Sequence, residues 1–237
     1  MNPDPRLPGS ARLEDSCGGV MFDFSGTLMR TESTSEWLRG VGASESQVLA
    51  WAGPLESVGA MPGGGAPAEV PAHLAQVWRD RDLTAEHHRA CYTALARLVV
   101  PEALAEALYN RSCTPEAWRP YPDALPTLRE LRRRGLRVAV VSNIGWDLRA
   151  LLALHGLADF VDVFVLSYEV GIEKPDPRIF QLACDKLGLP PGEVLMVGDD
   201  RRADGGAAAL GCPVYFVDHL PATARPDALR QILTWGI

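Results

Sequence analysis

Lysine is nearly absent from this chain: of the 23 basic residues among its 237, only Lys174 and Lys186 are lysine. Any reaction that needs a lysine ammonium or a lysine Schiff base therefore has two candidates. Positive charge is also outweighed overall, with a formal net charge of −7 and a pI of ≈ 5.3. This balance argues against nucleic acid as a partner, because binding to a phosphate backbone needs clustered positive charge.

Long apolar runs and paired cysteines are missing as well. No segment approaches the roughly 18 consecutive apolar residues of a membrane span, and residues 1–16 lack the apolar stretch of a signal peptide. The five cysteines are odd in number and widely spaced, without a C-x-x-C pair, which indicates neither a disulfide framework nor a zinc site. We therefore expect a cytoplasmic protein that has no membrane partner.

The chain alternates short apolar strands with helices over its last half. After a first strand at residues 18–23, strands are predicted at 137–142, 161–166, 194–198 and 214–217. Helices are predicted between and after them, over residues 123–134, 147–155, 176–187, 202–210 and 227–234. Short apolar strands in alternation with helices predict a parallel sheet that is covered on both faces.

A block of different character separates the first strand from the others. It contains helix-like segments at residues 35–42, 44–52, 68–79, 84–99 and 102–110, and a Gly- and Pro-rich stretch over 53–71 that we expect to be a mobile loop. The predicted architecture is an α/β core with an inserted all-helical cap. Its parts are an N-terminal tail (1–16), a core (17–30 and 119–237) and a cap (31–118).

Polar side chains follow the predicted strands at the edge where open parallel sheets bind ligands. They comprise Asp23 to Thr27, then Ser142 and Asn143, then Lys174, and finally Asp199, Asp200 and Asp204. Four carboxylates at one edge repel each other unless a cation lies among them, and hard oxygen ligands suit Mg²⁺. The ammonium of Lys174, the hydroxyl of Ser142 and free amides around Gly26 and Thr27 could then hold a phosphoryl group. Asp23 is placed as a nucleophile.

This set of residues resembles the haloacid dehalogenase-like (HAD) hydrolase superfamily, whose core is Rossmann-like. Four segments carry the resemblance, in order: residues 20–28 (VMFDFSGTL), 140–143 (VVSN), 171–180 (GIEKPDPRIF) and 197–204 (VGDDRRAD). Four motifs in order are far more specific than any one of them alone. The resemblance covers nearly the whole core, and an α-helical insertion directly after the first motif is typical of one subgroup.

The resemblance implies a role for each matched position. Asp23 would accept the phosphoryl group and, with the backbone carbonyl of Ser25 and with Asp199, would hold Mg²⁺. Asp200 or Asp204 would hold the metal through water. The phosphate would be bound by Gly26, Thr27, Ser142, Asn143 and Lys174. The expected partner is a small phosphorylated metabolite, which the cap would select.

Position 25 departs from the pattern of phosphatases in this superfamily. Their first motif has a second aspartate, which protonates the leaving group and then activates water, and this chain has Ser25 there. Acid–base help of this kind is typically worth about 10²–10⁴ in rate. The favoured hypothesis is a Mg²⁺-dependent phosphatase for substrates with good leaving groups or with their own proton donor.

Three alternatives follow from the same departure. The phosphonate-cleaving branch needs a lysine in its cap, and it is excluded because no lysine precedes Lys174. Dehalogenases also pair the nucleophile with a non-acidic residue two positions on, but their fourth motif generally lacks the acids of Asp199 and Asp200, and they need no metal. A weakened relative that only binds a phosphorylated ligand is the third alternative.

Three residues of the predicted cap look superficially like zinc ligands, namely His87, His88 and Cys91. They share one helix without a fourth partner, and we expect partly exposed helix residues rather than a site. His155 and His219 carry no discernible signal.

Overall fold

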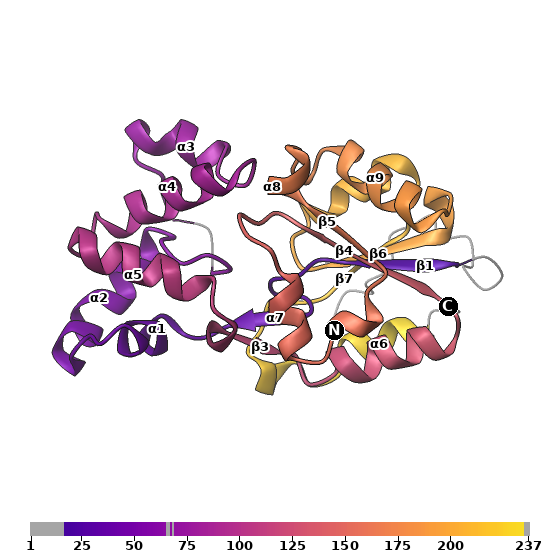
Figure 1. The fold of residues 1–237 in the computed structure, drawn as a ribbon, viewed down its shortest axis with the longest axis horizontal. Helices are drawn as coiled ribbons and strands as arrows, with labels where there is room; N and C mark the ends of the chain where they lie inside the picture. Colours follow the sequence, from indigo (N-terminus) through magenta and orange to yellow (C-terminus); the bar gives the residue numbers. More distant parts are fainter. Residues whose placement is uncertain (1–16, 65–66, 68, 235–237) are drawn as a thin grey trace, which may run out of the picture.

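The computed structural model of the chain describes residues 17–64, 67 and 69–234; the predicted tail, 1–16, lies outside these. Its main sheet has five parallel strands in the order β5-β4-β1-β6-β7 (Figure 1). They are β1 (Gly19–Phe22), β4 (Arg137–Ser142), β5 (Val163–Leu166), β6 (Val194–Gly198) and β7 (Val214–Phe216). The predicted parallel α/β fold is confirmed.

Both faces of the sheet are buried, which explains why its strands are apolar along their whole length. Alternate residues of β1 enter two different cores: Phe22 joins a cluster with Leu128 of α6 (Ala124–Arg133), and Met21 joins one with Phe180 of α9 (Pro177–Leu187). Figure 1 shows α6 and α9 on opposite sides of the sheet. The two-residue period of a strand therefore serves two hydrophobic cores.

Five helices lie together beside the part of the molecule that contains the sheet (Figure 1). They are α1 (Thr34–Gly40), α2 (Glu45–Ser57), α3 (Ala75–Arg79), α4 (Ala85–Ala96) and α5 (Glu102–Ser112). Ser33 and Ser44 each form a capping box, and the Thr84 hydroxyl caps α4, so local sequence fixes three of these helix starts. None of the described helices is both long enough and apolar enough to cross a membrane.

A short antiparallel ladder joins this helical block to the rest. It pairs β2 (Met29–Thr31) with β3 (Trp118–Pro120). The predicted domain boundaries, after residues 30 and 118, both fall inside this ladder, and they stay a prediction.

The predicted loop over residues 53–71 begins later than expected. Helix α2 continues through Pro54 to Ser57, and Leu55 is fully buried. The burial of Leu55 explains why the helix continues past a proline, since packing often overrides local propensity.

Two predicted α-helices near the C-terminus are 3₁₀ helices instead, over Asp204–Leu210 and Leu229–Thr234. Gly205 and Gly206 weaken α-helix formation in the first of them. A side chain at Gly206 would overlap the Pro175 carbonyl, so glycine allows this turn to approach the loop that carries Lys174.

The remaining helices are α7 (Arg149–Leu154), α8 (Ser167–Val170) and five short 3₁₀ turns at 72–74, 115–117, 158–160, 191–193 and 222–224.

Candidate active site

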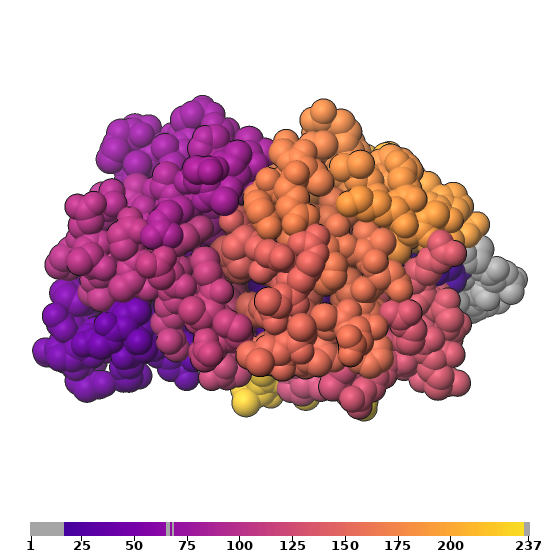
Figure 2. Space-filling model, viewed as in Figure 1, coloured from indigo at the N-terminus to yellow at the C-terminus, as the bar shows by residue number. Residues whose placement is uncertain are grey.

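A cavity of ≈ 560 Å³ lies where the carboxyl ends of the strands face the helical block. Its core wall includes Asp23, Ser142, Lys174 and Asp199, and its opposite wall comes from α3, α4 and the turn between them. In the space-filling view the helical block (indigo to magenta) contacts the sheet part (orange) along one seam (Figure 2). The topology thus brings the ends of several strands to one cavity, as expected for a parallel sheet.

Three carboxylates and one lysine form the centre of this cavity. Asp23, Asp199 and Asp204 each offer an oxygen atom, and these oxygens lie within 4.8 Å of one another. The Lys174 Nζ donates to Asp23 Oδ1 and to Asp204 Oδ1, each at 2.6 Å. One ammonium group therefore faces three carboxylates, and negative charge is in excess.

The electrostatics of the cluster follow from this excess. Burial raises the pKa of Asp23 well above its usual value; Lys174 opposes that rise, while Asp204 and Asp199 add to it. Burial alone would lower the pKa of Lys174, but Asp204 and Asp23 outweigh it and raise the pKa. Three hard oxygen donors with unbalanced charge fit a divalent cation such as Mg²⁺.

Asp204, and not Asp200, joins the cluster. Asp204 is fully buried, whereas Asp200 is exposed. The Asp200 Oδ1 accepts hydrogen bonds from the backbone N–H groups of Arg202 (2.8 Å) and Ala203 (2.9 Å). A side chain at Gly198 would overlap the Asp204 carboxylate, so the glycine of this motif makes room for that acid.

The predicted phosphate-binding residues lie around Lys174. Ser142 is buried at the end of β4 and lines the cavity. The Asn143 side chain bonds the Lys174 backbone in both directions: its Nδ2 donates to the Lys174 carbonyl (2.9 Å), and its Oδ1 accepts from the Lys174 N–H (2.8 Å). Asn143 thereby fixes the backbone from which the Lys174 side chain extends.

The loop after β1 uses its polar groups differently from expectation. The N–H of Gly26 donates to the Met29 carbonyl at 2.7 Å, so this amide is not free for phosphate. Gly26 has a φ of 78°, and a side chain there would overlap Asp199 and His219. The Thr27 hydroxyl, which is buried, contacts Asp199 Oδ1 at 3.4 Å. Thr27 therefore orients an acid of the cluster.

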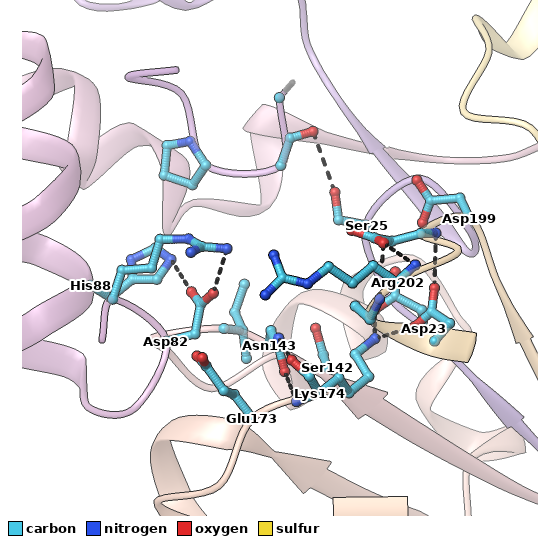
Figure 3. A pocket seen from close by; sticks show the side chains of 18 of the residues that line it. Asp23, Ser25, Asp82, His88, Ser142, Asn143, Glu173, Lys174, Asp199 and Arg202 are labelled. Atoms are coloured by element: carbon cyan, nitrogen blue, oxygen red, sulfur yellow. Dashed lines mark hydrogen bonds and ion pairs between the residues drawn. The ribbon is translucent and has the colours of Figure 1, made fainter. Parts of the chain in front are cut away.

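Ser25 faces the helical block. Its Oγ donates to the Gly63 carbonyl at 3.4 Å, and Figure 3 shows this contact above Asp23. The position that would hold a second carboxyl in the first motif therefore holds a hydroxyl group in contact with the loop after α2.

Two residues near the C-terminus, which no sequence pattern singles out, also shape the site. His219 Nδ1 lies 2.7 Å from Asp199 Oδ2, a contact that nothing in the sequence around His219 indicates. The buried Arg225 guanidinium donates to the carbonyls of Gly26 and Thr27, each at 2.5 Å, and stacks on the Tyr121 ring. Both lie about 200 residues from the first motif in sequence, and no local pattern marks either.

The far wall of the cavity is charged. The Arg81 guanidinium stacks 4.0 Å from the centre of the Trp78 ring and pairs with the buried Asp82 at 3.1 Å. His88 was expected to be partly exposed, which was wrong: it is buried against Tyr109, with Nδ1 and the phenol oxygen 2.9 Å apart. Burial lowers the pKa of His88 to about 3, so the ring is neutral.

Glu173 extends the charged wall from the core side (Figure 3). Burial raises the pKa of its carboxyl to about 7, and the nearby Asp82 carboxylate adds to the rise. Its Oε2 atom is buried and has no hydrogen-bond partner in the part of the chain that the structure describes.

We expect Glu173→Gln to raise the melting temperature more at pH 8 than at pH 5. A carboxyl whose pKa is higher in the folded state than its ordinary 4.5 costs stability as the pH rises from 4.5 towards 7. Glutamine removes this cost, which gives a difference of about 2–4 °C once solvent screening of a half-buried group is allowed for. Thermal denaturation without Mg²⁺ at both pH values measures it.

Glu169→Gln is the matched control. Hydrogen bonds with Arg149 lower the pKa of Glu169. The contribution of Glu169 to the free energy of unfolding therefore changes only below about pH 4.5, and the effect of Glu169→Gln on the melting temperature should be the same at pH 5 and pH 8. An equal shift of melting temperature at both pH values for Glu173→Gln would contradict the prediction.

Comparisons with known proteins all indicate the same family. A family model described as haloacid dehalogenase-like hydrolase matches residues 18–211. A phosphatase from Mycobacterium tuberculosis is 38% identical over 49% of this chain and 54% of its own length. (S)-2-haloacid dehalogenase 1 from Pseudomonas sp. is 40% identical over 38% of this chain and 40% of its own length.

A solved structure indicates the same family. L-2-haloacid dehalogenase from Xanthobacter autotrophicus superposes with a TM-score of 0.61 at 25% identity, covering 91% of this chain and 83% of that one. The chain spans about half the length of the curated relatives it matches. Because the family model extends over most of the chain and the four motif segments meet at one sheet edge, the chain belongs to the haloacid dehalogenase-like hydrolases.

Proposed function

We propose that this hydrolase is a Mg²⁺-dependent phosphatase, which cleaves a small phosphate monoester through an aspartyl-phosphate at Asp23. One observation carries the proposal: the oxygens of Asp23, Asp199 and Asp204 lie within 4.8 Å of one another beside the Lys174 ammonium. A displacement at carbon that needs no metal gains nothing from three converging carboxylates. A divalent cation would offset their excess negative charge and would bind the oxygens of a phosphate group.

The reaction requires two displacements at phosphorus. In the first, a carboxylate oxygen of Asp23 forms a bond to phosphorus, and the bond between phosphorus and the ester oxygen breaks; the leaving oxygen then takes up a proton. In the second, a water oxygen attacks phosphorus, the bond to Asp23 breaks, and inorganic phosphate leaves with the carboxylate restored.

The residues around Asp23 supply orientation and charge. Lys174, held by the Asn143 side chain, keeps Asp23 in place and would stabilise the phosphoryl oxygens, and Ser142 would donate to one of them. Mg²⁺ held by Asp23, Asp199 and Asp204 would supply positive charge against the same oxygens. Thr27 and His219 would keep Asp199 oriented.

Ser25 limits the range of substrates. A serine hydroxyl does not titrate near neutral pH, so it cannot protonate an alkoxide and then activate water. The favoured substrates therefore leave readily or bring their own proton donor.

Displacement at carbon is the second candidate function. It is favoured by the absence of a carboxyl at position 25 and by relatives that are named dehalogenases. Binding of a phosphorylated ligand without turnover is the third.

A release assay separates the three. Sugar, nucleotide, acyl and aryl phosphates are incubated with and without Mg²⁺, beside 2-haloacids monitored for halide, and Asp23→Asn serves as the blank. We expect phosphate release that needs both Mg²⁺ and Asp23. Halide release without a metal requirement would replace the proposal with dehalogenation, and neither release would leave a binding protein.

A further inference from the structure

The cationic groups that line the cavity are nearly all occupied. Lys174 is bound by two carboxylates, Arg81 by Asp82, and Arg79 by Gln76. Across residues 17–64, 67 and 69–234, the Arg202 guanidinium has no hydrogen bond or ion pair, although it lines the same cavity and is near enough to Glu173 to act on its charge. It is therefore available to an anionic group of a ligand.

The backbone of Arg202 is fixed, and its side chain, although exposed to solvent, extends into the cavity. The Asp200 carboxylate accepts from the Arg202 N–H at 2.8 Å. Figure 3 shows the side chain extending from the metal-binding edge, beside Ser25 and Asp199, into the space towards Asp82. A guanidinium in this position lies between the phosphate-binding residues and the far wall.

Across the same space lies an unpaired group of the opposite sign. The Glu173 Oε2 is buried without a partner among the described residues, and the neighbouring Asp82 is already paired with Arg81. Glu173 and Arg202 form no ion pair with each other in the structure. Among the residues that the structure describes, the cavity thus presents Arg202 as an unpaired cation and Glu173 as an unpaired acid, both beyond the residues that would hold the phosphate.

We propose that the substrate is a phosphate monoester that carries both a carboxylate and an ammonium group, as an O-phosphorylated amino acid does, with Arg202 binding the carboxylate and Glu173 the ammonium. This inference rests on the proposed function. A guanidinium binds a carboxylate through two parallel hydrogen bonds, and Glu173 gains the donor that its buried oxygen lacks. A substrate with only one of the two groups leaves either the acid or the cation unpaired.

Four ligands that differ only in these groups test the proposal. They are O-phosphoserine, 3-phosphonooxypropanoate (no ammonium), O-phosphoethanolamine (no carboxylate) and ethyl phosphate (neither). Kd is measured by calorimetry in the original protein without Mg²⁺, so that binding is read without turnover, and KM and kcat are measured in the same protein with Mg²⁺. We expect O-phosphoserine to bind most tightly and ethyl phosphate most weakly.

Two substitutions assign the groups. Arg202→Gln should raise Kd for the two carboxylate ligands by roughly 10- to 100-fold, the usual range for a lost hydrogen bond to a charged group, and leave the other two nearly unchanged. Glu173→Gln should do the same for the two ammonium ligands. Arg201→Gln, which removes an exposed neighbour stacked 4.9 Å from the centre of the Phe216 ring, and Glu169→Gln are the matched controls.

The outcomes distinguish this inference from the proposed function. If the four ligands bind equally, if none binds, or if Arg202→Gln weakens all four alike, the assignment is overturned. If they are hydrolysed without discrimination, the phosphatase proposal stands and this inference fails. If the Kd values follow the expected order but no phosphate is released, the recognition stands and the phosphatase proposal fails.

Discussion

Asp199→Asn should remove nearly all Mg²⁺-dependent phosphate release, whereas Asp200→Asn, one residue further on, should keep most of it. Asp199 provides one of the three clustered carboxylates, and the amide of asparagine carries no charge to hold a divalent cation. The Asp200 carboxylate instead caps the backbone turn at Arg202 and Ala203. We expect Asp199→Asn to lower both Mg²⁺ affinity and kcat by at least about 100-fold.

Thermal denaturation gives a readout of this site that does not depend on turnover. Mg²⁺ that binds only the folded protein stabilises it, by about 2.7 kcal/mol at 100 times its Kd. We therefore expect millimolar Mg²⁺ to raise the melting temperature of the original protein and of Asp200→Asn, but not that of Asp199→Asn. Without Mg²⁺ the Asp199→Asn protein should be more stable than the original protein, because one of three mutually repelling charges is gone.

Two results would remove Asp199 from the metal site. One is a melting temperature that does not respond to millimolar Mg²⁺ in the original protein. The other is an Asp199→Asn variant that keeps its turnover while Asp200→Asn loses it.

The order of strands and motifs could be predicted because the signals are local. An apolar run followed by an acid or a small polar residue marks the end of a buried strand, and parallel strands bring all such ends to one edge. This logic predicts that Asp23, Ser142, Lys174 and Asp199 lie close together, and all four line one cavity.

The choice between neighbouring acids could not be made from sequence, because it depends on the turn between them. Asp200 and Asp204 both follow β6 within the same few residues. The turn directs the carboxylate of Asp200 to the backbone N–H groups of Arg202 and Ala203, and that of Asp204 towards Lys174. Gly198 was the available signal, since only a residue without a side chain leaves room for the Asp204 carboxylate.

Residues that act through long-range contacts gave no signal at all. Arg225 reaches the carbonyls of Gly26 and Thr27 from the C-terminal segment, and His219 reaches Asp199 from the same segment. The exposure of His88 was misjudged for a related reason: its face of α4 packs against Trp146, which lies outside the helical block. Periodicity identifies an apolar face but does not identify what covers it.

Ser25→Asp should speed the hydrolysis of an alkyl phosphate by between ten-fold and the roughly 10⁴-fold limit for acid–base help. A carboxyl at this position lies where related phosphatases hold their proton donor, and the Gly63 carbonyl 3.4 Å from the present hydroxyl favours its protonated form. An aryl or acyl phosphate should gain less, because its leaving group needs little protonation in the first displacement. Rates of phosphate release for the two substrate classes measure the difference.

Two controls make the result specific to a titrating group at position 25. Ser25→Asn has nearly the same shape as the aspartate variant but cannot transfer a proton, so it should show no gain. The gain should also vanish in an Asp23→Asn background, since an acid has no reaction to assist without the nucleophile. If a folded Ser25→Asp protein hydrolyses alkyl phosphates no faster than the original, the serine does not stand in for a missing acid. The three carboxylates around Lys174 would then serve a displacement that needs no proton donor, or binding alone.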